Sequence, residues 1–256
     1  MLLSELTSPS VIAVVASMAL QPLALALLIA PLITYGYEDI LASPSSGLPE
    51  VKALIASEAE GGRGVDPIRV ALSRFHGRLA IIYHIHFLLL VLLYSIIMFR
   101  PLSFKYIAID SYMVGSLRRA IFYRVSVALL VSALVTVLVS ISSAAIIAGV
   151  SGGAGFTGIL GVLAPSMLLL IPPAIALSLG AIAVTRDYVV LAVMGTFYSW
   201  LALVYGAASP LYESPLTTIN LVVGEVSGED FNTSLYIGLT MVPLVMGLAS
   251  VSRYDV

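Results

Sequence analysis

The strongest constraint on this chain is a run of sixty-one residues, 125–185, that contains no Asp, Glu, Lys or Arg. Soluble domains carry about 25% charged residues, whereas this chain carries 10% and is 60% hydrophobic. The run also exceeds the roughly 20 apolar residues that a helix needs to cross a bilayer. Because a membrane-spanning segment must satisfy its backbone hydrogen bonds internally, these segments are expected to be helices.

Six apolar segments are long enough to span a membrane. We therefore predict an all-α polytopic membrane protein with a single transmembrane domain over residues 1–256. The predicted spans are about 11–35, 79–99, 125–150, 158–184, 188–208 and 235–251.

Glycine and proline predict where these spans turn or bend. The uncharged, glycine-rich stretch SGGAGFTG at 151–158 divides the third span from the fourth, which predicts an antiparallel helical hairpin. Prolines lack the N–H that a helix interior needs, so a kink is expected at Pro165 and at the pair Pro172–Pro173. Pro22 and Pro31 could act in the same way in the first span.

The basic residues are distributed unevenly over the predicted loops. The side with both termini, the loop 100–124 and the short loop 185–187 carries seven basic and four acidic residues, and the other side carries five basic and ten acidic. Short cytoplasmic loops are enriched in Lys and Arg. We therefore expect a multi-pass plasma-membrane protein with both termini in the cytoplasm and with outer loops at 36–78 and 209–234.

Both outer loops contain features of interest. The segment 66–77 shows apolar residues at helical spacing, which fits either an amphipathic helix on the outer leaflet or an ordinary helix packed on the loop. The triplet Asn232-Thr233-Ser234 is a glycosylation sequon in the second outer loop, although such triplets are also frequent by chance.

Several chemistries find no support in the sequence. Neither of the two lysines follows a glycine, so the chain has no phosphate-binding loop of the ATPase type. His84 and His86 point about 200° apart on a helix and cannot share a metal, so we expect them to be satisfied by interhelical or interfacial hydrogen bonds. With no cysteine and no clustered acidic residues in the spans, we predict no catalytic residues, no metal site and no enzymatic activity. The net charge of −2 argues against a nucleic-acid partner.

Three of the twelve basic residues, Arg118, Arg119 and Arg124, stand just before the uncharged run. Anchoring to lipid headgroups would explain the arginines, but it does not explain the turn sequence Gly115-Ser116-Leu117 that precedes them.

This segment resembles the cytoplasmic segment between the second and third spans of type-2 ABC transporter permeases. In that family an acidic residue and a spacer precede Gly-Ser/Thr-Leu, a short basic and apolar helix, and a Val-Ser turn into the third span. Here Asp110, 115–117, 118–121 and Val125-Ser126 occupy the matching places. The chain end, ASVSRYDV, is also similar to the family's basic terminal cluster.

The resemblance implies a cytoplasmic coupling helix between the second and third spans, which docks on a soluble ATPase. Its implied residues are Asp110, Gly115, Ser116, Leu117, Arg118, Arg119, Ile121 and Phe122. Gly115 would allow the turn and Ser116 would cap a helix over 117–123. Leu117, Ile121 and Phe122 would supply apolar contact and the two arginines would pair with acidic groups, whereas Arg124 would anchor to headgroups.

Two functions are therefore expected from different classes. The first is the permease subunit of an ATP-driven exporter in a prokaryotic cell membrane, paired with a second permease copy or a paralogue. The partner ATPase would bind ATP and Mg, and an extracellular subunit could dock on loop 36–78. The alternative is a non-catalytic scaffold subunit of a respiratory or secretory complex. The small residues Ser132, Ser140, Ser142 and Ser143 could line a substrate path, but helix packing is the commoner reason for such composition.

Overall fold

The computed structural model describes residues 7–34, 68, 72, 75–103, 112, 115–151, 155–184, 237, 240–242, 244–246 and 249. All regular structure in these residues is helical, which confirms the all-α prediction for this part of the chain. The helices are α2 (Pro9–Ala19), α3 (Gln21–Thr34), α7 (His76–Ser103), α9 (Leu117–Ser151), α10 (Phe156–Leu168) and α11 (Ile171–Val184).

Four segments of the described chain are long and apolar enough to cross a membrane. They are 9–30, 81–98, 119–151 and 156–180. They correspond to the first four predicted spans and mark the chain as a membrane protein. The predicted fifth span, 188–208, lies outside the described residues, and the sixth is described only at scattered positions, which are helical.

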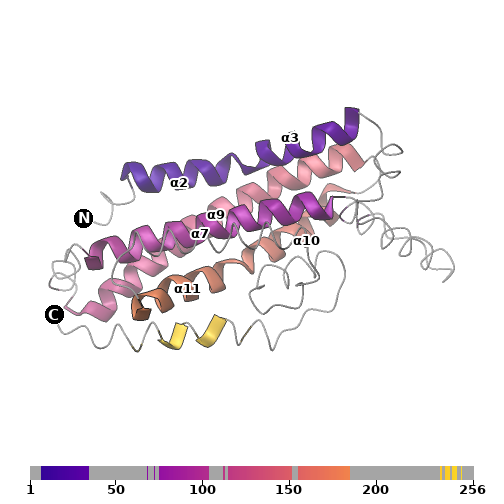
Figure 1. Ribbon diagram of the computed structural model, residues 1–256. Coiled ribbons are helices and arrows are strands. Elements are labelled where there is room, and N and C mark those ends of the chain that lie inside the picture. The colour runs from indigo at the N-terminus through magenta and orange to yellow at the C-terminus, as the bar shows by residue number, and fades with distance from the viewer. Residues whose placement is uncertain are drawn as a thin grey trace.

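The helices run back and forth along one axis (Figure 1). Helices α7 and α9 contact each other and lie between the α2–α3 pair and the α10–α11 pair. Helix α7 ends and α9 begins at the same end of this bundle, which we call the Leu117 end; the opposite end, where α9 finishes and α10 starts, is the Phe156 end. The antiparallel arrangement of α9 and α10 confirms the predicted hairpin.

Prolines interrupt two of the spans. Helix α2 stops before Leu20 and α3 resumes at Gln21, with Pro22 at the second position of the new helix. Helices α10 and α11 are separated at 169–170, directly before Pro172 and Pro173. A proline cannot donate the hydrogen bond that continues a helix, but it fits the first turn of a new one. The predicted kinks near Pro22 and Pro172–Pro173 thus coincide with interruptions of the helix, whereas the helices continue through Pro165 and Pro31.

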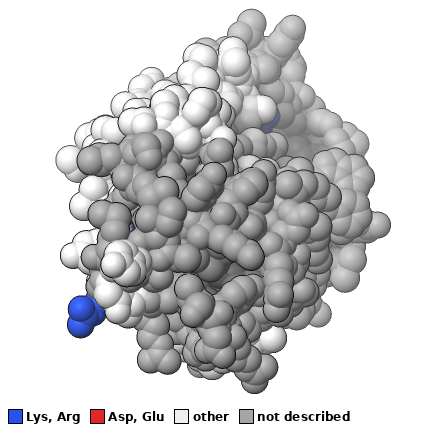
Figure 2. Space-filling view, turned by 90° about the vertical axis from the view of Figure 1, so that its left-hand side faces the viewer, with Lys and Arg blue, Asp and Glu red and all other residues white. Residues whose placement is uncertain are grey.

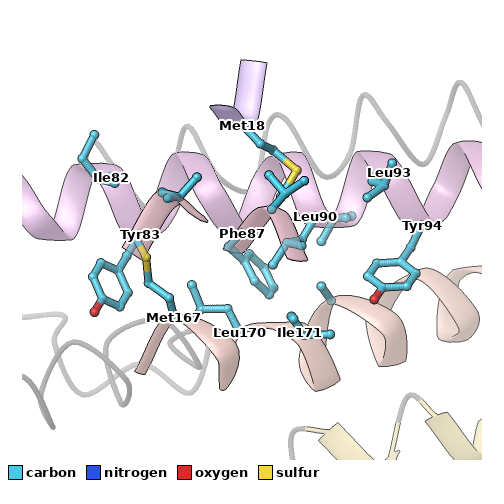
Figure 3. Packing of buried hydrophobic residues seen from close by; sticks show 14 of the residues in the cluster. Met18, Ile82, Tyr83, Phe87, Leu90, Leu93, Tyr94, Met167, Leu170 and Ile171 are labelled. Atoms are coloured by element: carbon cyan, nitrogen blue, oxygen red, sulfur yellow. The ribbon is translucent and has the colours of Figure 1, made fainter. Parts of the chain in front are cut away.

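The core is built mainly on α7. Figure 3 shows Tyr83, Phe87 and Tyr94 of α7 pointing toward α10 and α11, where Met167 and Leu170 meet them; all five are buried. Large apolar residues also cover the outside of α9. They are Leu129, Leu130, Leu134, Val137, Leu138 and Ile141. A contiguous apolar surface of this kind suits lipid rather than water.

The apolar positions of segment 66–77 that the structure describes pack against the bundle. Leu72 and Phe75 are almost fully buried, and Ile68 packs against the core. Ile68 approaches Gly158 so closely that a methyl group on the glycine would overlap Ile68 Cδ1. These three side chains therefore face the bundle rather than a lipid leaflet.

Candidate functional site

The Leu117 end contains the turn that the sequence predicts before α9. Gly115 adopts φ 82°, a left-handed conformation that glycine reaches without a Cβ penalty. The hydroxyl Oγ of Ser116 accepts a hydrogen bond from the backbone N–H of Arg119 at 3.3 Å, and the Ser116 carbonyl accepts one from Ala120 at 3.1 Å. These are the bonds of a helix N-cap. The glycine turn and the serine cap are therefore confirmed.

The first two turns of α9 expose a mixed basic and aromatic surface. Arg119 is exposed and Phe122 is 72% exposed, while Ile121 is buried in the bundle at 7%. Ile121 is thus not available for the docking contact expected of it, and Tyr123, which the sequence analysis did not single out, is exposed beside Phe122. Figure 2, which views the Leu117 end, shows a basic group projecting from the described surface there.

Other residues of the predicted docking segment are less completely described. Asp110 lies outside the described residues, as does Asn232 of the sequon. Leu117 and Arg118 form the first positions of α9, but their side chains are outside the described part. Tyr112, in the same segment, is almost fully exposed.

Helix α9 differs from the expected arrangement in its continuity. The resemblance implied a short helix that ends in a turn at Val125-Ser126, but α9 runs unbroken from Leu117 to Ser151. No proline occurs in this range, and its only glycine is Gly149, so nothing in the sequence ends the helix at 125. The segment expected to dock is therefore the first part of the long helix that also forms the third candidate span.

Arg124 also lies elsewhere than expected. We predicted that it anchors to headgroups, but its side chain is 1% exposed. Its Nη1 donates a hydrogen bond to the backbone carbonyl of Ile97, on α7, at 3.1 Å. The headgroup role is therefore wrong, because the guanidinium turns into the bundle and finds a carbonyl acceptor there.

A second polar cluster lies inside the bundle and joins three helices. His86 Nδ1 is 2.8 Å from Gln21 Oε1, and His86 Nε2 is 2.9 Å from Thr136 Oγ1. Because an amide oxygen can only accept, this arrangement requires the proton on Nδ1, and in a neutral ring Nε2 then accepts from the threonine hydroxyl. The expectation that His86 is satisfied between helices is confirmed. Gln21 stands at the break between α2 and α3, and its buried Nε2 has no partner among the described residues.

Smaller polar contacts tie α7 and α9 to the other helices. The Tyr94 hydroxyl bonds Ser132 Oγ at 2.7 Å, and Tyr83 shares a hydrogen bond with Ser166. Ser140 Oγ donates to the Thr136 carbonyl at 2.8 Å and lies 3.3 Å from Met167 Sδ. Three of these four contacts join different helices of the chain. Ser132, Ser140 and Ser143 of α9 are buried and Ser142 is exposed, so helix packing accounts for three of the four serines.

Carboxylates and clustered metal ligands do not occur among the described residues, which contain no Asp or Glu and no group of three or more potential metal ligands. No family model, no curated protein and no solved structure matches the chain.

Proposed function

We propose that this chain is the membrane-spanning permease subunit of an ATP-driven transporter, and that the start of α9 docks on a soluble ATPase. Transport would follow from the ATPase's cycle of closure and opening, passed to the spans as rigid-body motion. In this proposal ATP and Mg bind to the partner, and this chain catalyses nothing.

The capped, glycine-led start of α9 carries the proposal. Anchoring a helix to headgroups requires only basic and aromatic residues. It does not require a left-handed glycine followed by an N-cap serine, which together set the direction in which the helix leaves the turn. A well-defined start with exposed Arg119 and Phe122 suits contact with another protein.

The length of α9 supports the same proposal. Its 35 residues extend about 52 Å at 1.5 Å per residue, compared with about 30 Å of hydrocarbon. A helix this long projects from the hydrocarbon even when it is tilted. Projection at the Leu117 end places the first turns within reach of a cytoplasmic partner, provided that this end is the cytoplasmic one.

The rest of the proposal follows the sequence. The chain would have six spans with both termini in the cytoplasm of a prokaryotic cell. Two such subunits, or one and a paralogue, would form the translocation path between them. Because the described helices are tightly packed together within the chain, a path between subunits is more consistent with the bundle than one through it. Export is the direction that the family resemblance favours.

Co-purified ATP hydrolysis tests the proposal. The tagged chain is isolated from its own cells in mild detergent, and Mg-dependent ATP hydrolysis is measured per mole of chain. We expect the pair Arg119→Glu with Phe122→Asp to lower it at least tenfold, because both groups are exposed at the docking surface.

The matched control is Phe156→Asp with Thr157→Glu at the Phe156 end, where both side chains are exposed. It introduces the same two residues at the opposite end and should leave the hydrolysis unchanged. If no hydrolysis accompanies the unmodified chain, or if both double variants lose it equally, the proposal is refuted.

A further inference from the structure

Helix α7 contains a gap in its own hydrogen-bond ladder. In an α-helix the N–H of residue i bonds the carbonyl of residue i−4. Pro101 lies within α7 and has no N–H, so it cannot bond the carbonyl of Ile97. A buried carbonyl without a partner is strongly disfavoured, more so where no water is available.

Arg124 supplies the missing bond from α9. Its Nη1 lies 3.1 Å from the Ile97 oxygen. Hydrogen bonds from an ionised donor are stronger than neutral ones, and a guanidinium keeps its charge in proteins. The bond therefore joins the last turns of α7 to the second turn of α9, across 27 residues of sequence.

The burial of Arg124 indicates that this contact is more than incidental. A long basic side chain near the end of a membrane helix usually extends its charge toward the headgroups. Phe122 and Tyr123 of the same turn do face outward, so an outward route exists beside Arg124. Its side chain instead turns inward and is 1% exposed.

Arg78 provides a contrast at the other end of α7. Its Nε donates to the carbonyl of Leu28 on α3 at 3.0 Å. Residue 32, four positions after Leu28, is a leucine with an ordinary N–H, so Leu28 is not deprived of a helical donor. Only the Arg124 contact compensates for a proline among these two arginine–carbonyl bonds.

We propose that Pro101 and Arg124 form a joint between α7 and α9. Pro101 leaves the Ile97 carbonyl without its helical donor, and Arg124 donates to that carbonyl instead. The end of α7 and the start of α9 then move together. Arg124 is then a positioning residue. The joint rests on the geometry of this chain, and what it would transmit, the motion of a docked ATPase to two spans at once, rests on the proposed function.

A double-mutant cycle on the purified chain tests the joint. Arg124→Met removes the donor and keeps much of the apolar stem, and Pro101→Ala restores the helical N–H. We expect Arg124→Met to lower the Tm by about 5 °C in the native background. In the Pro101→Ala background the same substitution should lower it by less than half as much, because Ile97 then has its own donor.

Arg78→Met is the matched control, since it removes an arginine–carbonyl bond that does not involve Pro101. Its Tm loss should be the same in the native and the Pro101→Ala backgrounds. Arg124 has at least one further interaction, so Arg124→Met will still lower the Tm somewhat in the Pro101→Ala background. The cycle isolates the part of the Tm change that depends on Pro101. An Arg124→Met loss that is equal in both backgrounds overturns the joint.

The distance between α7 and α9 can be measured independently of the stability of the chain. The chain has no native cysteine, so spin labels can be placed at Ile96→Cys on α7 and Tyr123→Cys on α9. Arg124→Met should broaden the label–label distance distribution, and adding Pro101→Ala should leave it broad, because the restored N–H satisfies Ile97 without rejoining the helices. A distribution that stays narrow in Arg124→Met refutes the joint.

If Arg124→Met does not fold alone, the combination with Pro101→Ala should fold, and failure of both counts against the joint. All of these measurements use the isolated chain. Their outcome is therefore separate from that of the ATPase test, and either proposal can fail without the other.

Discussion

Single residues at the Leu117 end show both the reach and the limit of sequence reasoning. The turn at Gly115 and the cap at Ser116 are local, because their geometry depends on neighbours within four positions, and both were predictable. The partner of Arg124 is 27 residues away on another helix. No pattern of neighbouring residues shows that Arg124 faces the carbonyl of Ile97, which lacks its helical donor because of Pro101.

The contact of His86 with Gln21 and Thr136 has the same character. The sequence indicated that the histidine would be satisfied, but its partners lie 65 and 50 residues away. The available signal was that Gln21 is the only glutamine of the chain and stands directly before Pro22. A polar side chain inside a span needs a partner, so a lone glutamine there predicts a contact without naming it.

The conformation of Gly115 leads to a prediction about substitution by alanine. An added Cβ at Gly115 has nothing within 4 Å, so the effect should come only from the backbone at φ 82°. Gly115→Ala should therefore destabilise the chain by about 1 kcal/mol. Gly149→Ala, within α9 and also unobstructed, should stabilise it by up to about 1 kcal/mol. Reversible unfolding in mixed micelles measures both, and equal signs would contradict the assignment of the turn.

At the scale of the element, α9 owes its packing to a repeat of small residues. Its buried face carries Ala128, Ser132, Thr136, Ser140 and Ala144, one every fourth position. Small residues at this spacing let neighbouring helices approach closely. Composition alone does not show which face of a helix is covered, so it cannot decide whether the serines of α9 pack against neighbours or line a path.

Two neighbouring alanines of α9 test this face. Ala144 is fully buried and Ala145 is exposed. Ala144→Leu should destabilise the bundle by about 1–3 kcal/mol through overpacking, while Ala145→Leu should stay within about 0.5 kcal/mol. The same unfolding assay applies. A similar loss at both positions would mean that the outer face of α9 is also covered, by a partner subunit for example.

At the scale of the whole molecule, the four apolar helices of the described chain were predictable because lipid imposes length and composition on every span. The family pattern predicted a turn at Val125-Ser126, but α9 is continuous there. The better guide was local, because 117–148 contains no proline or glycine that would end a helix. Which helices touch could not be read from apolarity, which only indicates that each helix has a covered and an uncovered side.

Cysteine accessibility tests the orientation of the whole bundle. Tyr112 and Thr157 are exposed near opposite ends of α9 and α10. In intact cells, Thr157→Cys should react with a membrane-impermeant maleimide, and Tyr112→Cys should react only after permeabilisation, as the distribution of basic residues predicts. The native chain provides the background, since it has no cysteine. The reverse pattern would place the Leu117 end outside and remove the basis for ATPase docking.

The contact between Ile68 and Gly158 has a consequence for the order of events during synthesis. The two residues are separated by ninety positions, so at about 5–20 residues per second the ribosome completes Gly158 roughly 5–20 s after Ile68. The segment around Ile68 is thus synthesised before the helix α10 against which it packs. The packing of Ile68 against Gly158 is therefore a late step of folding, because it can form only after the start of α10 has been synthesised.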